Sequence, residues 1–238
     1  MYTFQSRVRY SELSCDEQLS IPGIVNYFQD CSTFQSEDLG RGIDWLNEHN
    51  RCWVVNSWQG KIFRRPTLGE TIHICTWPHD MRGMFGERNF CIRDAAGQDL
   101  VIAESLWTYM DTSKMRPVKV DKDVLATYRL EDPIRAEWKG RKILVPDDME
   151  VMEPIKVGAH LLDTNGHVNN GKYVMLAMEY VPVRFEISAF RVEYKRSALP
   201  GEKMVPYVKR TQERIVVVFK DTEEQIDTIV EFERGTIC

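Results

Sequence analysis

The segment DTNGHVNNGKYVMLAMEYV, residues 163–181, joins a polar loop to an amphipathic helix. Across residues 170–181 apolar side chains recur at helical spacing, and Asn169 or Asn170 is suited to cap the start of that helix. Residues 24–39 have the same apolar spacing. Each half of the chain is therefore predicted to begin with one substantial helix.

Both helices are followed by segments rich in β-branched and aromatic residues, which predict strands. In the first half the predicted strands are residues 52–55, 71–77, 88–92 and 100–107, with Ala96-Gly97 as a hairpin turn. In the second half they are residues 190–194, 204–208, 214–219 and 227–232. A helix followed by an antiparallel meander, occurring twice, predicts an α+β protein with an internal duplication.

The length of 238 residues allows two domains, each large enough to bury a core. Hydrophobic residues make up 43% of the chain and charged residues 28%, which is typical of a globular protein. We expect an N-terminal domain at residues 1–125, a linker at 126–152 and a C-terminal domain at 153–238. A short helix is expected at residues 122–130, because so long a connection is rarely without structure.

Charge and cysteine usage exclude several classes of protein. A net charge of −5 argues against a general nucleic-acid binder. The six cysteines form no CxxC pair, so we expect reduced thiols without a disulfide framework or a zinc site. No run approaches the roughly 20 apolar residues of a membrane span, and no signal peptide is evident, so we expect a cytoplasmic protein.

Local basic clusters could guide an anionic ligand despite the overall negative charge. They are Arg64-Arg65, Arg82 with Arg88, and Lys195-Arg196. The alternative is ordinary solvated surface charge.

The loop before the second helix carries more polar chemistry than a turn requires. Capping explains Asn169 or Asn170, but it gives no common purpose to Asp163, Asn165 and His167, which we predict to be catalytic. Asp163 and His167 can exchange protons, whereas Asn165 can hold a water or a carbonyl oxygen. Two routes stay open: direct attack by Asp163 on a substrate carbonyl, and attack on that carbonyl by a water molecule that a base activates.

Residues 163–173 resemble the catalytic segment of the acyl-acyl carrier protein (acyl-ACP) thioesterases, whose pattern Asp-x-Asn-x-His-Val-Asn-Asn is kept at every specified position. Trp53-Val54-Val55, and residues 106–111 followed by Arg116-Pro117, resemble the N-terminal domain of that family. The resemblance implies two tandem hotdog domains, each a curved antiparallel sheet wrapped around a central helix. It also implies hydrolysis of fatty acyl-ACP thioesters to free fatty acid and ACP, which ends fatty acid synthesis.

The resemblance implies a division of labour, with the acyl chain held by the N-terminal domain and the catalysts supplied by the C-terminal domain. Residues 12–23, which precede the first helix, lack the Asn and His of the loop, so one active site is expected. No metal or organic cofactor is needed. The acyl tunnel and ordinary core packing are alternative roles for the aromatic residues Phe28, Phe34, Trp53 and Trp107. Because carrier proteins are acidic, a basic rim is expected from Arg64-Arg65 or Lys195-Arg196.

This chain departs from the family at Ser197 and Ala198, where plant members carry an acidic residue followed by cysteine. A cysteine nucleophile at that position is therefore excluded. The role of the family's glutamate is dispensable, taken by Ser197, or filled from elsewhere. Two other functions stay open: an acyl-CoA thioesterase using the same loop, and a non-catalytic acyl-binding protein. Chain length, saturation preference and oligomeric state are not set by the sequence, and a homodimer is one option.

Overall fold

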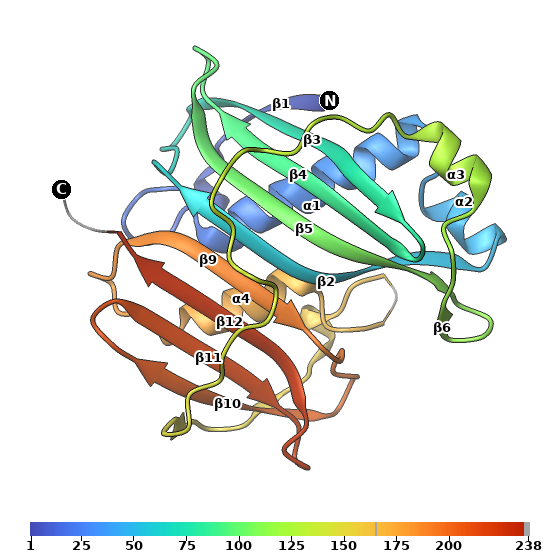
Figure 1. The fold of residues 1–238 in the computed structure, drawn as a ribbon. Helices are drawn as coiled ribbons and strands as arrows, with labels where there is room; N and C mark the ends of the chain where they lie inside the picture. Colours follow the sequence, from blue (N-terminus) through green and yellow to red (C-terminus); the bar gives the residue numbers. More distant parts are fainter. Residues whose placement is uncertain (165, 236–238) are drawn as a thin grey trace. The chain divides into compact units, whose positions relative to one another are not determined.

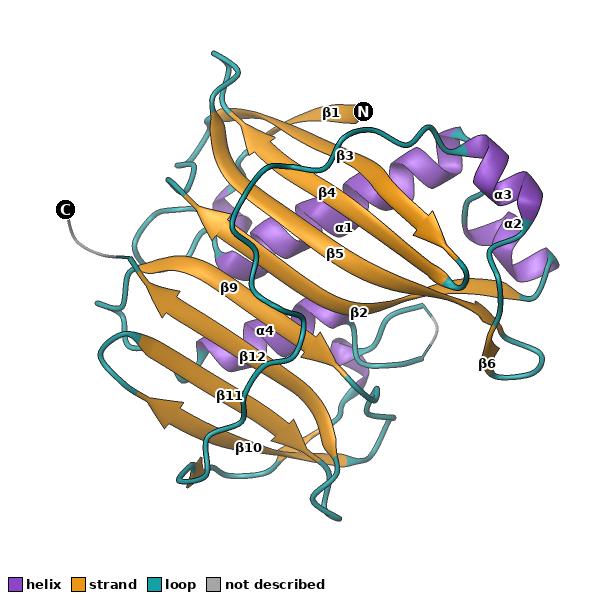
Figure 2. Ribbon diagram, viewed as in Figure 1, coloured by secondary structure: helices purple, strands orange, loops and turns teal. Residues whose placement is uncertain are grey.

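The computed structural model describes residues 1–164 and 166–235, which divide into two units (Figure 1). Unit 1 consists of Met1–Asn56 and Ile62–Glu137, and unit 2 consists of Ser57–Lys61 and Trp138–Cys238. Each unit combines one main helix with antiparallel strands (Figure 2), which confirms the predicted α+β class. Within the described ranges, no helix has the length and apolar character needed to cross a membrane.

Unit 1 contains an antiparallel sheet with one face against a long helix. Its helices are η1 (Tyr10–Glu12), α1 (Ile21–Asp38), α2 (Ile43–Glu48) and α3 (Lys122–Thr127). Its strands are β1 (Tyr2–Arg7), the first half of β2 (Arg51–Ile62), β3 (Thr71–Arg82), β4 (Phe85–Arg93), β5 (Asp99–Asp111) and β6 (Arg116–Pro117). The strand order is β1-β3-β4-β5-β2, and β6 pairs with β5. Figure 1 shows α1 crossing one face of β3, β4 and β5.

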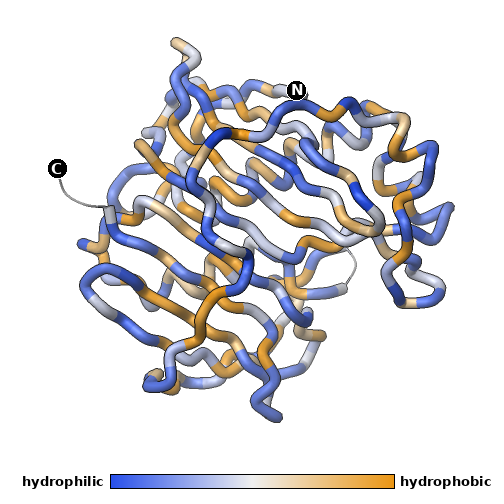
Figure 3. Tube along the Cα trace, viewed as in Figure 1, coloured by the Kyte–Doolittle hydropathy of each residue, from blue (hydrophilic) through white to orange (hydrophobic). Residues whose placement is uncertain are grey.

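The start of α1 follows from its sequence. The Ser20 hydroxyl caps the helix by accepting the Gly23 N–H at 3.1 Å, and Pro22 occupies the first turn, where a missing N–H costs no helical hydrogen bond. Gly40, at a φ of +66°, follows the end of the helix. Hydrophobic residues recur along the strands of both units (Figure 3). Phe28 of α1 packs on Phe90 of β4, with ring centroids 5.2 Å apart.

The opposite face of the unit 1 sheet is crossed by the segment that follows α3. The indole N–H of Trp77 donates to the Asp132 carbonyl at 2.9 Å, and the Ile134 N–H donates to Asn89 Oδ1 at 2.8 Å. Part of the stretch that the sequence suggested as a linker is therefore bonded to the unit 1 sheet. The predicted domain limits themselves stay a prediction.

Unit 2 repeats the arrangement on a smaller scale. Its helices are η2 (Ala159–Leu161) and α4 (Asn170–Met178). Its strands are β7 (Glu150–Val151), β8 (Ile155–Lys156), β9 (Ile187–Tyr194), β10 (Lys203–Arg210), β11 (Arg214–Lys220) and β12 (Ile226–Arg234). Residues 57–61 of β2 pair with β9, and β12, β11, β10 and β7 follow in that order. Tyr173 of α4 packs on Phe219 of β11, with ring centroids 5.7 Å apart.

The structure confirms both main helices and all eight predicted strands, with shifted ends. The second helix stops at Met178, before its predicted end at residue 181, and α3 stops at Thr127 where residue 130 was expected. The Ala96-Gly97 turn is confirmed by the Gly97 N–H donating to the Asp94 carbonyl at 3.0 Å. Strand β1 and helix α2 were not predicted.

Candidate active site

The predicted catalytic loop connects η2 to α4 in unit 2, and its two sides bond to each other. Leu162 and Val168 form an antiparallel bridge, and the Asp163 N–H donates to the His167 carbonyl at 2.8 Å. Gly166 has a φ of +75°, a conformation that favours glycine, and it lets the chain reverse. Asp163 and His167 are therefore held opposite each other across a tight turn.

The Asp163 carboxylate takes part in closing this turn. Its Oδ1 accepts the His167 backbone N–H at 3.2 Å, while the Asp163 carbonyl accepts the Gly166 N–H at 3.1 Å. A carboxylate accepts several hydrogen bonds, so this contact leaves acceptor capacity for other partners. Asp163 and His167 are both half-buried, which leaves part of each accessible to solvent. Asn165, the third predicted site residue, lies outside the described residues.

The start of α4 decides which backbone donors are available. The Asn169 side chain caps the helix by accepting the Gly171 N–H at 2.8 Å, and the Asn169 carbonyl accepts the Lys172 N–H at 2.9 Å. Of the two predicted caps, Asn169 is therefore the one used. Among described partners the Asn170 N–H makes no hydrogen bond, so of residues 170–172 it is the donor left at the positive end of the helix dipole.

The segment that departs from the family pattern lies beside this loop. The Val168 N–H donates to the Ala198 carbonyl at 3.3 Å, and the Ala198 N–H donates to the Tyr173 hydroxyl at 2.9 Å. Burial raises the pKa of Tyr173 to about 12, and hydrogen bonds from the Ala198 backbone and the Ser197 side chain partly oppose that rise. Ser197 thus lies next to the loop, immediately before Ala198 in the chain.

A buried carboxylate that the sequence analysis missed belongs to the same region. Asp227 is fully buried, and its Oδ1 accepts the Arg196 Nε–H at 2.7 Å. Its Oδ2 is sealed from solvent without a hydrogen-bond partner among the described residues, and burial raises the pKa of this carboxyl group. The Asp227 charge also contributes to raising the pKa of Tyr173. The only hint in the sequence is an acidic residue within the apolar strand IDTIVEF, residues 226–232.

The basic pairs expected to form a rim are bonded to carboxylates of their own chain. Arg64 pairs with Glu70 at 2.6 Å, and Arg65 pairs with Asp16. Lys195 pairs with Glu193 at 3.1 Å. Arg196 contacts three carboxylates, those of Glu202, Asp221 and Asp227. These internal ion pairs reduce the attraction that the four side chains offer to an acidic partner.

The aromatic candidates for an acyl tunnel divide by burial. Phe28 is fully buried between α1 and the unit 1 sheet. Phe34 is 45% exposed and packs edge-on against Phe4, so it does not belong to the buried core, and its tunnel role stays a prediction. Trp53 packs on Tyr109 with ring centroids 4.7 Å apart. The Trp107 indole N–H donates to the Ser105 hydroxyl at 2.6 Å.

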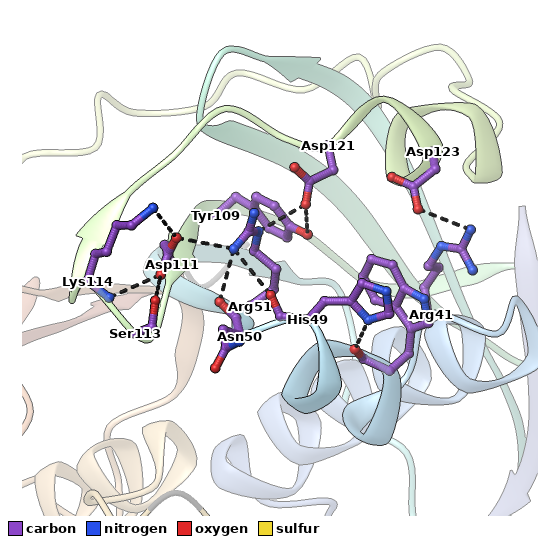
Figure 4. Close-up of polar contacts among 11 residues, drawn as sticks. Arg41, His49, Asn50, Arg51, Tyr109, Asp111, Ser113, Lys114, Asp121 and Asp123 are labelled. Atoms are coloured by element: carbon purple, nitrogen blue, oxygen red, sulfur yellow. Dashed lines mark hydrogen bonds and ion pairs between the residues drawn. The ribbon is translucent and has the colours of Figure 1, made fainter.

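A second polar cluster lies in unit 1 and is centred on Arg51 (Figure 4). Arg51 donates to Asp121 Oδ2 at 2.9 Å and to Asp111 Oδ2 at 3.3 Å, and the Tyr109 hydroxyl donates to Asp121 at 3.1 Å. Because Asp121 is the N-cap of α3, these bonds fix that helix to β2 and β5. Within residues 1–164 and 166–235, no group of three or more His, Cys, Asp or Glu side chains could hold a metal ion.

Comparisons with known proteins match both halves of the chain to domain models of one family. Residues 1–128 match the family model of the acyl-ACP thioesterase N-terminal domain, and residues 145–234 match that of the C-terminal domain. A chloroplastic palmitoyl-acyl carrier protein thioesterase of Arabidopsis thaliana is 28% identical over 208 residues, covering 79% of this chain and 50% of its own. A chloroplastic dodecanoyl-[acyl-carrier-protein] hydrolase of Umbellularia californica is 28% identical over 206 residues, covering 79% and 54%. The chain spans about half the length of the curated relatives it matches.

Solved structures agree on the fold. An acyl-ACP thioesterase from Bacteroides thetaiotaomicron has a TM-score of 0.88 at 20% identity, covering 98% of this chain and 97% of its own. The 12:0-ACP thioesterase from Umbellularia californica has a TM-score of 0.86 at 21% identity, covering 98% and 96%. This likeness confirms the expected hotdog fold. With both domain models matched along its length, the chain belongs to the acyl-ACP thioesterase family.

Proposed function

We propose that the protein hydrolyses fatty acyl-ACP thioesters to free fatty acid and ACP, the reaction that ends fatty acid synthesis. Family membership supports the reaction class. The observation that carries the proposal is the turn that holds Asp163 and His167 opposite each other, at the start of α4. Unit 2 then supplies the catalysts, and unit 1 holds the acyl chain.

Asp163 and His167 share the proton transfers in this proposal. Attack by water on the thioester carbon requires a base to take a proton, and departure of the thiolate requires an acid to return one. We assign Asp163 as base or nucleophile, His167 as the general acid/base partner and Asn165 as the residue that positions water or substrate. If Asp163 attacks directly, an anhydride forms and water hydrolyses it in a second step. Neither route needs a metal or an organic cofactor.

The oxyanion that develops on the thioester carbonyl needs hydrogen-bond donors. We assign the Asn170 N–H to this role, because the Gly171 and Lys172 N–H groups are already bonded to Asn169. The α4 dipole favours negative charge at the same place. Ser197 and Tyr173 support the loop through Ala198, and the buried Asp227 supplies an acidic group to this region in a chain that lacks one at residue 197.

A second candidate is hydrolysis of acyl-CoA thioesters, and one observation weakens the preference for ACP. All four side chains expected to attract an acidic carrier protein are in ion pairs within the chain: Arg64, Arg65, Lys195 and Arg196. An acidic carrier protein would have to compete with those carboxylates. The catalytic loop itself serves either thioester.

Release of free thiol from a ladder of acyl chains on ACP and on CoA tests both candidates. We expect turnover on ACP, with loss of kcat by at least about 100-fold in His167→Ala and in Asp163→Asn, the usual size of a lost acid/base contribution. Thr164→Ala, an exposed neighbour in the same loop, is the matched control and should keep parent activity. Equal efficiency on CoA would remove the assignment to ACP, and no turnover on any thioester would remove the hydrolase assignment.

We further propose that the protein works in a reducing compartment, the cytoplasm. The cysteines of the described residues are all free, three of them buried, as suits a reducing environment. The curated relatives are named as chloroplastic, so fractionation of the native cells is the deciding measurement. Monomer and homodimer are both options for the assembly, and sedimentation of the purified chain distinguishes them.

A further inference from the structure

Arg88 lies on β4 and points to the face of the sheet that α1 covers in unit 1. Its Nη1 donates to Gln35 Oε1 of α1 and, at 3.1 Å, to Thr76 Oγ1 of β3. The guanidinium carbon lies 5.6 Å from the centroid of the Tyr128 ring. The residue is only 7% exposed. The sequence suggested a basic cluster of Arg88 with Arg82, but Arg82 is exposed and pairs with Asp80, so the cluster does not form.

Arg88 differs from every other buried charge of the described residues. The four buried carboxylates all form ion pairs: Asp111, Glu193, Asp227 and Glu231. Arg88 is the one buried cation, and none of the carboxylates described lies within ion-pair distance of it. Burial of an ion costs several kcal/mol, and arginine keeps its charge in proteins. Two neutral acceptors and an aromatic ring offset only part of that cost.

The Arg88 guanidinium also has N–H donors that no hydrogen bond to the described residues uses. It carries five N–H groups, and both of its hydrogen bonds use Nη1. Nε and Nη2 bond to none of the described residues, yet neither is among the side-chain nitrogens sealed from solvent. Together they form the planar edge that binds a carboxylate through two parallel hydrogen bonds. The Nε and Nη2 edge of Arg88 is therefore suited to bind an anion such as a carboxylate.

The surroundings of Arg88 suit the rest of an acyl group. Phe90 is two residues further along β4, on the same face of the strand, and its ring packs on Phe28 of α1. An alkyl chain bound along this aromatic pair would bring its far end to the guanidinium. Burial also lowers the pKa of Arg88, because it disfavours the charged form of the guanidinium.

We propose that Arg88 binds the carboxylate at the far end of an ω-carboxyacyl chain, so that the enzyme accepts thioesters of dicarboxylic acids. The inference rests on the proposed hydrolase function and on acyl binding in unit 1. It adds a substrate class, because a methyl-terminated chain would leave the cation without its partner. A chain with a terminal carboxylate would form an ion pair with it.

The test compares kcat/KM on ω-carboxyacyl-ACP and on methyl-terminated acyl-ACP of equal chain length. We expect the ratio of the two values to fall at least about tenfold in Arg88→Met, which removes the charge while keeping an unbranched side chain. Arg88→Lys should restore part of the ratio, since it keeps the charge without the planar edge. Arg93→Met, which removes a paired arginine from the same strand, is the matched control and should leave the ratio unchanged.

A binding measurement separates this inference from the hydrolase proposal. Dodecanedioate should raise the Tm of the parent protein more than dodecanoate does, and Arg88→Met should abolish that difference. If no thioester is hydrolysed but dodecanedioate still gives the larger Tm shift, the hydrolase proposal fails and the Arg88 site stands. An unchanged ratio in Arg88→Met, or equal loss on both substrates with a lowered Tm, would overturn the inference and make Arg88 a structural residue.

Discussion

Asp163 has two tasks that a pair of substitutions separates. Its Oδ1 closes the turn by accepting the His167 N–H, and its charge is the proposed base or nucleophile. Asp163→Asn keeps an acceptor oxygen but loses the charge, whereas Asp163→Ala loses both. We expect both variants to lose kcat, and only Asp163→Ala to lose about 1 kcal/mol of unfolding free energy, the usual net value of such a bond. Chemical denaturation beside steady-state kinetics checks this, and near-parent kcat in Asp163→Asn would contradict the catalytic assignment.

The Tyr173 hydroxyl supports the catalytic loop through its hydrogen bond with the Ala198 backbone. In Tyr173→Phe the buried Ala198 N–H loses its acceptor, which should cost about 1–3 kcal/mol of unfolding free energy. Because Ala198 also accepts the Val168 N–H, we expect a loss of kcat as well. Tyr180→Phe is the control, since the hydroxyl of Tyr180 bonds to none of the residues described, and it should change neither quantity. A stable Tyr173→Phe variant with full activity would show that the Ala198 contact does not position the loop.

Asp111 should make the stability of the folded protein depend on pH, and its hydrogen-bond and charge partners set the direction of that dependence. Hydrogen bonds from the Ser113 hydroxyl and the Lys114 N–H, with the charges of Lys114 and Arg51, hold the pKa of Asp111 at about 2. The unfolded chain has the ordinary value near 3.9. The pKa of the Asp111 carboxyl group is therefore lower in the folded state than in the unfolded chain. The stabilisation of the folded state by this carboxylate is complete above pH ~4 and is lost as pH falls toward 2. We expect Asp111→Asn to lower the Tm by a constant amount at neutral pH, with the difference from the parent shrinking below pH 4. A difference that does not change down to pH 2 would exclude this linkage.

At the scale of the elements, the pairing of β2 with β9 requires a glycine at position 60. Gly60 lies opposite Phe190, and a Cβ at Gly60 would overlap the fully buried Phe190 ring. Gly60→Ala should therefore cost about 1–3 kcal/mol, the usual penalty of overpacking. Phe190→Leu shortens the facing side chain, so the double variant should be more stable than the sum of the two single effects implies. A double-mutant cycle from urea denaturation measures that coupling, and strict additivity would show that the two residues do not clash.

The elements that the sequence predicted are those with strong periodicity, and the missed ones lack it. Residues 24–39 and 170–181 show helical spacing, and the main strands are rich in β-branched residues. Strand β1, YTFQSR, has polar residues on one face and only partly buried residues on the other, so no apolar signal marks it. Helix α2 has six residues, too few for a period to be visible.

The candidate site was predictable where its residues are adjacent in the chain. Asp163 and His167 were found because one short loop holds both. Asp227 was missed because its partner Arg196 is 31 positions away, and only the folded sheet brings them together. Arg88 was visible as a basic residue, but its burial without a carboxylate depends on packing that no local pattern encodes.

At the scale of the whole molecule, unit 2 depends on five residues from the other half of the sequence. Residues 57–61 pair with β9, and Gln59 makes two hydrogen bonds to the Lys139 backbone, at 3.0 and 3.1 Å. Trp58 is almost completely buried. A fragment of residues 138–238 therefore lacks a strand of its own sheet and exposes the edge of β9, which favours aggregation.

We expect the fragment of residues 138–238 to be unfolded or aggregated, although it contains the whole catalytic loop. Addition of a peptide of residues 51–62 should restore protection of the β9 amides in hydrogen exchange, because it returns the missing strand. The same peptide with Trp58→Ala is the matched control, and it should bind about 3–5 kcal/mol more weakly, the usual cost of truncating a buried aromatic side chain. A monomeric fragment that folds cooperatively without the peptide would mean that β12, β11 and β10 suffice to hold β9, and that residues 57–61 are dispensable to unit 2.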